Sequence, residues 1–261
     1  MKPKRLIACF DIIDGYVTKG LKFQDNVRID KAEDVAKWVT KEGVDEIIVF
    51  DVTASAQKRP PDFAMVVRVS RELTVPFIVG GGIRNMDDVR EMMKSGADKL
   101  SVDSIAVRNS SIISEAAREY GSGSVVLSMQ VVRVNKTEQI PSGFEITIDG
   151  ARVMTGKDAI EWAKEAERLG AGEICVNSVE NDGVLGGYDL ELTGAVADAV
   201  SVPVIASGGA GAPKHLIDVF TKTKAEAGII SSMLYSPRME RNYKVAEIKE
   251  ALKNAGVSVN I

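Results

Sequence analysis

Residues 74–82 read TVPFIVGGG, and residues 201–209 read SVPVIASGG. The two stretches are 201 − 74 = 127 residues apart, and each is an apolar run that ends in glycines. The same spacing relates Ser104 to Ser231. A period of this length is far longer than any solenoid repeat. The sequence therefore predicts two related halves fused in tandem.

Strand and helix patterns alternate from one end of the chain to the other. Short β-prone runs predict strands at residues 5–10, 46–51, 76–79, 98–102, 124–129, 173–177, 203–206 and 227–231. Helical patterns follow at residues 31–42, 61–73, 85–95, 109–119, 157–169, 188–199, 212–223 and 242–254. Eight strands, each followed by a helix, predict an α/β fold, a (β/α)8 TIM barrel built from two fused half-barrels. A doubly wound sheet is the alternative, although the uniform composition favours closure.

Two long connections interrupt this rhythm within a single domain of residues 1–261. Residues 131–156 carry alternating β-prone positions around turn signals, which predicts a hairpin insertion after the fifth strand. The segment from Asp14 to about Asp30 includes Lys19, Lys22 and Arg28. We expect it to be a mobile lid that attracts phosphate groups.

Composition excludes several classes of protein. The 261 residues are 45% hydrophobic and 27% charged, with a net charge of -4, which argues against a nucleic-acid binder with a basic surface. The amino terminus meets charge too early to suggest a signal peptide, no apolar run reaches membrane-spanning length, and the two cysteines lie in apolar runs. We therefore expect a cytoplasmic protein. His215, the single histidine, is expected at the surface and argues against a catalytic triad or a multi-histidine metal site.

Asp11 follows the first predicted strand, and Lys19 lies on the loop beyond it. A carboxylate at the end of a parallel barrel strand is a common position for a catalytic group. An aspartate that caps a nearby backbone group is an equally simple interpretation of this stretch alone.

Glycines and serines follow the strands that the repeat relates. Glycines between a strand and a helix let backbone amides approach an anion. Two phosphate sites, one in each half, would bind a long ligand with a phosphate at each end, although the glycines could also serve only tight turns. The predicted phosphate-binding residues of this kind are Gly81, Gly82, Ser104, Ser207, Gly208, Gly209, Ser231 and Ser232. The repeat counterpart of Asp11 between these sites is Gln130.

Seven motifs, in order and spacing, resemble the cyclase subunit of imidazole glycerol phosphate synthase along essentially the whole chain. They are RLIACFDIIDG, VFDVTAS, VGGGIRN, GADKLSVDS, GAGEI, NDGVLGGYD and IASGGAG. The resemblance implies a barrel that receives ammonia from a glutaminase subunit in a heterodimer. Its substrate would be a bis-phosphorylated phosphoribulosyl-formimino ribonucleotide, converted to imidazole glycerol phosphate and an aminoimidazole carboxamide ribonucleotide. No metal or redox cofactor is implied.

The resemblance also assigns roles to single residues. Asp11 matches the family's acid/base carboxylate and Lys19 its loop-one lysine, while Asp51 and Asp182 match further acidic positions and Gly183 lies in the same Asp-Gly motif as Asp182. The family's second carboxylate belongs at position 130, where a glutamine cannot exchange a proton at neutral pH.

Three further departures surround position 130. Asp103 replaces a family asparagine, and Asn177 and Val184 each replace a threonine. Asp103 could have taken over the missing catalytic role, with Gln130 and Asn177 packed around it as substrate-binding groups. Otherwise the mouth of the barrel has been refitted for another phosphorylated ligand or has lost its chemistry.

Arg5, Glu46, Lys99 and Glu173 lie near the starts of four strands, so they could form a ring of alternating charge inside the barrel floor. On physical grounds the ring could be a salt-bridged plug or a channel. The resemblance implies an ammonia gate, with Asp98 on the face toward the glutaminase.

Two other functions remain open. A phosphoribosyl aminoaldose-ketose isomerase of the sister family also uses carboxylates at strand ends. A diverged paralogue could act on, or only bind, another phosphorylated ligand.

Overall fold

The computed structural model describes residues 2–21, 24–54, 57 and 59–260. Its centre is a closed barrel of eight parallel strands. They are β1 (Arg5–Ile13), β4 (Glu46–Asp51), β5 (Phe77–Gly80), β6 (Lys99–Val102), β7 (Val125–Arg133), β10 (Glu173–Ser178), β11 (Val204–Ser207) and β12 (Ala227–Ile229). Each strand pairs with the next, and β12 pairs with β1 from Ala227 opposite Arg5. The predicted TIM barrel is confirmed.

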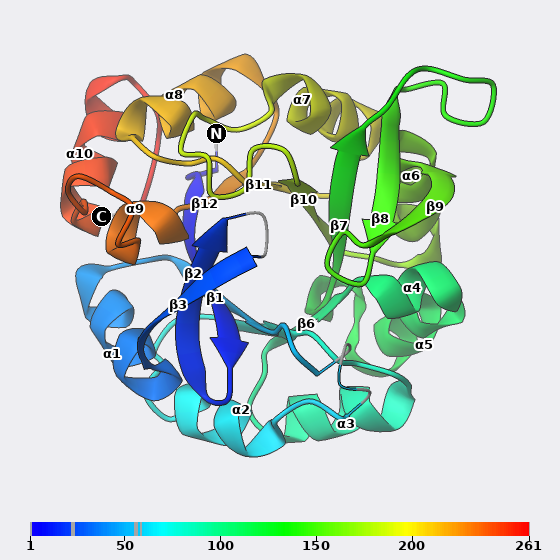
Figure 1. Cartoon of the computed structure of the whole chain (residues 1–261), viewed down its shortest axis with the longest axis horizontal. Helices are drawn as coiled ribbons and strands as arrows, with labels where there is room; N and C mark the ends of the chain where they lie inside the picture. Colours follow the sequence, from blue (N-terminus) through cyan, green and yellow to red (C-terminus); the bar gives the residue numbers. More distant parts are fainter. Residues whose placement is uncertain (1, 22–23, 55–56, 58, 261) are drawn as a thin grey trace.

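An outer ring of helices covers the barrel (Figure 1). They are α1 (Ala32–Glu42), α2 (Phe63–Ser70), α3 (Met86–Lys94), α5 (Ser111–Tyr120), α6 (Ala159–Leu169), α7 (Leu190–Ala199), α8 (Pro213–Lys222) and α10 (Val245–Asn254). A 3-10 turn, η1 (Ser122–Ser124), precedes β7. Within the described residues, every helix is too short or too polar to cross a lipid bilayer.

Successive side chains of each strand point to opposite faces of the barrel wall, and this produces two apolar cores. In β1, Leu6, Ala8 and Phe10 belong to the large core between strands and helices. Ile7 belongs to a smaller core inside the barrel, with Cys9 packed against it. Each fully buried aliphatic side chain stabilises the fold by about 1.5–3 kcal/mol. The inward positions that follow along each strand lead to the mouth of the barrel, so strand register decides which side chains reach the site.

The repeat is visible in the element bounds. Helices α1 and α6, strands β4 and β10, and strands β5 and β11 are each shifted by 127 residues at both ends, as in 159 − 32 = 127. Strands β1 and β7 are shifted by only 125 − 5 = 120 residues. The difference of seven residues lies in the connections that follow β1 and β7.

The structure corrects the end of the eighth strand. It ends at Ile229 rather than residue 231, because Ile230 precedes a five-residue helix, α9 (Ser231–Tyr235). A matching helix, α4 (Ser104–Arg108), follows β6 at the repeat spacing. Neither helix was predicted, since five residues are too few to show helical periodicity.

The segment after β1 is a β-hairpin rather than an irregular loop. Strand β1 continues to Ile13 and pairs with β2 (Tyr16–Leu21), which pairs with β3 (Gln24–Lys31). Figure 1 shows β2 and β3 crossing over the middle of the barrel. Lys22 of the predicted lid lies outside the described residues. After β7, strands β8 (Phe144–Ile148) and β9 (Val153–Asp158) extend the sheet in antiparallel pairs.

Candidate active site

A cavity of about 790 Å³ opens at the carboxyl ends of the barrel strands. The predicted catalytic and substrate-binding residues line it together, with one exception. Gly183 lies outside the lining, and its backbone amide instead donates a hydrogen bond to the Asp182 carboxylate. The structure therefore brings residues from both halves of the chain to one site.

Asp11 and Lys19 meet in the lining of this cavity. Asp11 points inward from β1 and Lys19 comes from β2, with the lysine Nζ 4.0 Å from the Asp11 Oδ2. Burial raises the pKa of Asp11 to about 6, although Lys19 lowers it and Asp182 raises it further. Burial opposes the charge of Lys19, but the two carboxylates raise the pKa of Lys19 overall. A carboxyl with a pKa this close to neutrality can exchange protons at physiological pH.

Gln130 connects Asp103 to the second half of the mouth. The Ser207 hydroxyl donates to Asn177 Oδ1 at 2.8 Å, and Asn177 Nδ2 donates to Gln130 Oε1 at 2.8 Å. The remaining Gln130 amide group hydrogen-bonds the Asp103 side chain. Asn177 also hydrogen-bonds Asp182. Because each amide then has its oxygen accepting and its nitrogen donating, the network fixes the orientation of both side chains.

Asp103 is the second carboxyl group of the site with a strongly shifted pKa. Burial raises the pKa of Asp103 to about 7, while the hydrogen bond from Gln130 lowers it. The residue precedes α4, yet its side chain makes no capping hydrogen bond to that helix. The Asp103 carboxyl is therefore turned toward Gln130 and the cavity rather than used as a helix cap.

The two glycine loops have the same backbone conformation. Gly81 and Gly208 both have φ near +85°, at 86° and 85°. A side-chain carbon on Gly81 would lie 2.5 Å from the carbonyl oxygen of Asp51, and one on Gly208 would lie 2.7 Å from that of Ser178. Only glycine fits both demands, so each loop follows the cavity wall with its backbone.

The sequence predicted His215 at the surface, and the structure corrects this prediction. It is half-buried, and its Nδ1 accepts a hydrogen bond from the Gly211 amide at 3.1 Å. Burial lowers the pKa of His215. Through this hydrogen bond, His215 helps to hold the glycine loop that follows β11 in place.

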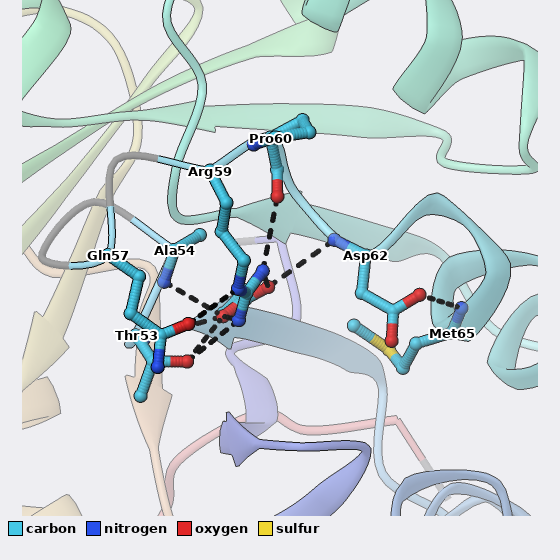
Figure 2. Close-up of polar contacts among 8 residues, drawn as sticks. Thr53, Ala54, Gln57, Arg59, Pro60, Asp62 and Met65 are labelled. Atoms are coloured by element: carbon cyan, nitrogen blue, oxygen red, sulfur yellow. Dashed lines mark hydrogen bonds and ion pairs between the residues drawn. The ribbon is translucent and has the colours of Figure 1, made fainter.

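Asp51 organises the loop after β4. Arg59 pairs with both Asp51 oxygens at 2.6 and 2.9 Å and also donates to Gln57, Thr53 and Pro60 (Figure 2). Backbone amides of Thr53, Ala54 and Asp62 donate to the same carboxylate. With its oxygens so engaged, Asp51 shapes the wall of the cavity rather than acting on a ligand.

The predicted charge ring closes the opposite end of the barrel. Arg5 pairs with Glu46 and Glu173, and Lys99 Nζ lies 3.2 Å from a carboxylate oxygen of each. Asp98 is exposed on the same face, and its carboxylate accepts a hydrogen bond from the Phe77 amide at 2.8 Å. Two cations and two anions thus alternate around the barrel floor.

Sequence reasoning missed several charged residues of the cavity wall. Arg59, Arg84, Arg108, Asp149 and Arg152 all line it. The Lys-Arg-Pro-Pro-Asp run that contains Arg59 follows the second strand and could have drawn attention. Arg108 ends an unpredicted helix, and Arg152 lies in the insertion, so no strand-end pattern pointed to either.

Comparison with known proteins agrees with this geometry. The family described as histidine biosynthesis protein matches residues 5–240. Imidazole glycerol phosphate synthase subunit HisF of Desulfosudis oleivorans is 48% identical over 100% of this chain and 99% of its own length. The proteins of the same name from Desulfatibacillum aliphaticivorans and Syntrophobacter fumaroxidans are 48% and 47% identical, each over 99% of this chain and 98% of their own length. The chain therefore belongs to the histidine biosynthesis protein family and resembles, along its whole length, the cyclase subunit of imidazole glycerol phosphate synthase.

Proposed function

We propose that the protein is an ammonia-dependent cyclase of histidine biosynthesis. It converts a bis-phosphorylated phosphoribulosyl-formimino aminoimidazole carboxamide ribonucleotide to imidazole glycerol phosphate and aminoimidazole carboxamide ribonucleotide. One cavity holds two glycine-serine walls together with the Asp11–Lys19 pair, and this observation carries the proposal. The first wall consists of Gly81, Gly82 and Ser104, and the second of Ser207, Gly208, Gly209, Ser231 and Ser232. A ligand with a phosphate at each end spans the walls and presents its middle to Asp11.

The chemistry needs groups that remove and return protons as ammonia is incorporated and the ring closes. Asp11, whose pKa is about 6, is the base, because it is largely ionised at pH 7. Asp103, whose pKa is about 7, is the acid and replaces a carboxylate at position 130. Lys19 holds the ionised form of Asp11 and comes from the hairpin over the mouth.

Ammonia enters from the other end of the barrel. The ring of Arg5, Glu46, Lys99 and Glu173 is the gate, and the surface around Asp98 receives a glutaminase subunit in a heterodimer. Between the ring and Asp11 lies the small apolar core of the barrel, which excludes water from the reactive nitrogen. We place the assembly in the cytoplasm.

The direct test is turnover of the bis-phosphorylated ribonucleotide by the purified chain with ammonium salt at pH 8, measured by the appearance of both products. Asp11→Asn should lower the rate at least about 100-fold, since it removes a general base. Glutamine should replace ammonia only after the glutaminase subunit is added.

Two outcomes would contradict the cyclase assignment. If the chain binds the ribonucleotide but forms no products in the presence of ammonia, it is a binding protein rather than a cyclase. Conversion of the phosphoribosyl aminoaldose without ammonia would identify the isomerase instead.

A further inference from the structure

The basic side chains that line the cavity all come from the part of the chain that ends at Arg152. They are Lys19, Arg59, Arg84, Arg108 and Arg152. Among the described residues, no lining residue after Arg152 is basic, and the wall from Cys175 to Ser232 offers neutral groups and Asp182. The two glycine-serine walls therefore share a backbone geometry but differ in charge.

A count of guanidinium donors separates the arginines. Arg59 uses all five donors within its own loop, so it has none left for a ligand (Figure 2). Arg84 uses two donors in a two-point pair with Asp88 at 2.8 and 2.9 Å, which holds its guanidinium group on that carboxylate although three donors stay unused among the described residues. Within the described part of the chain, the guanidinium groups of Arg108 and Arg152 each donate one hydrogen bond. Arg108 donates to the Asp149 carboxylate, and Arg152 donates to the backbone carbonyl oxygen of Asp149. Each of these two arginines keeps four donors and is held by a single hydrogen bond, so both can turn toward an anion.

The turn between β8 and β9 fastens Arg108 beside Ser104. Asp149, Gly150 and Ala151 have φ of 56°, 69° and 64°, so three successive residues are left-handed. The Asp149 amide donates to the Ser104 hydroxyl at 3.0 Å, while its carboxylate pairs with Arg108. The Ser104 hydroxyl still has its own proton to donate. The turn thus lies directly over the first residue of α4, the helix shown beside β8 in Figure 1.

We propose that Arg108 and Arg152 are specificity-determining residues that bind the ligand's phosphate group at Ser104, and that Asp149 is the internal anion this phosphate displaces from Arg108. The inference rests on the proposed function only in taking the ligand to be a phosphate ester.

The displacement follows from charge and geometry. A phosphate at Ser104 carries more charge than a carboxylate and offers three acceptor oxygens to the guanidinium fork. The Arg108 side chain is 48% exposed, so it can swing between the two anions without leaving water. The phosphate at Ser104 is thus bound by charge, while the phosphate at Ser231 and Ser232 is bound by neutral donors. The cavity consequently orients an asymmetric ligand.

Binding of inorganic phosphate, followed by isothermal titration calorimetry at low salt, tests the proposal without turnover. Ser232→Glu blocks the other wall, so that one site is titrated. In that background Arg108→Ala should weaken phosphate binding roughly tenfold, because it removes a charged hydrogen-bond donor. Asp149→Asn should instead strengthen phosphate binding, since asparagine keeps the left-handed turn but competes poorly for Arg108. In the Arg108→Ala protein, Asp149→Asn should have no further effect.

Arg71→Ala, an exposed arginine remote from the cavity, is the matched control and should leave phosphate binding unchanged. Where Arg108→Ala fails to fold, Arg108→Gln keeps the length of the side chain and gives the same comparison. If Asp149→Asn weakens phosphate binding, the Arg108–Asp149 ion pair only holds the structure together, and the proposal is overturned. Unchanged phosphate binding in both Arg108 variants would overturn it as well. Loss of cyclase turnover with these phosphate affinities intact would overturn the proposed function alone.

Discussion

Asp11 and Asp103 are two half-buried carboxyl groups, and the pKa of Asp11 is the lower of the two. Asp11, at about 6, must be ionised to accept a proton, so activity should rise as pH passes 6. Asp103, at about 7, must be protonated to donate, so activity should fall above pH 7. We expect a bell-shaped kcat/KM profile when rates are expressed per concentration of unprotonated ammonia. Asp103→Asn should abolish the fall of kcat/KM above pH 7 and lower its maximum. If the fall above pH 7 persists in this variant, a group other than Asp103 causes it.

Position 130 supplies a second test at the same scale. If Asp103 carries the acid role, Gln130→Asp places two carboxylates where one proton is shared, and kcat/KM should fall about tenfold or more. Gln130→Asn is the matched control because asparagine has the length of aspartate but carries no charge. A rate that rises in Gln130→Asp would instead mean that Gln130 is a simple loss of the family's carboxylate.

At the scale of elements, β2 favours the ionised form of Asp11 against the effect of burial. Lys19 lowers the pKa of Asp11 from across the β1–β2 pair, 4.0 Å away. Lys19→Met keeps the length of the side chain but removes the charge, so the lower limb of the pH profile should move to higher pH. The hairpin should remain folded, as judged by an unchanged circular dichroism spectrum. An unmoved limb would show that the lysine contacts only the ligand.

The sequence predicted the barrel elements better than those at its mouth. Strand β4 and the repeat-related helices were visible because buried strands and amphipathic helices have strong apolar patterns. The helix α4 was missed because five residues are too few to show helical periodicity, and the hairpin β2–β3 because most of the described β3 side chains are exposed and form no apolar run. Asp11 and Gln130 were found at strand ends, whereas Arg108 and Arg152 reach the cavity from segments with no such pattern.

At the scale of the whole molecule, the charge ring joins strands from both halves of the barrel. Glu46→Gln leaves Arg5 and Lys99 with a single carboxylate, Glu173, in a nearly enclosed position. We expect a loss of roughly 3 kcal/mol in the free energy of unfolding, measured in urea, because a buried ion pair loses one partner. Glu91→Gln removes an exposed pair with Lys94 and should cost less than about 1 kcal/mol. A loss in Glu46→Gln as small as that in Glu91→Gln, below about 1 kcal/mol, would show that the ring contributes little to stability.

The matched helices α4 and α9 begin at Ser104 and Ser231, one full repeat apart. An ancestral duplication would have supplied two identical anchors from a single ancestral half, and the seven-residue difference after β7 then altered only one of them. Such an arrangement lets evolution change how one end of a substrate is recognised while the other end and the shared reaction centre stay as they were. Enzymes of this construction can therefore acquire new substrates one anchor at a time.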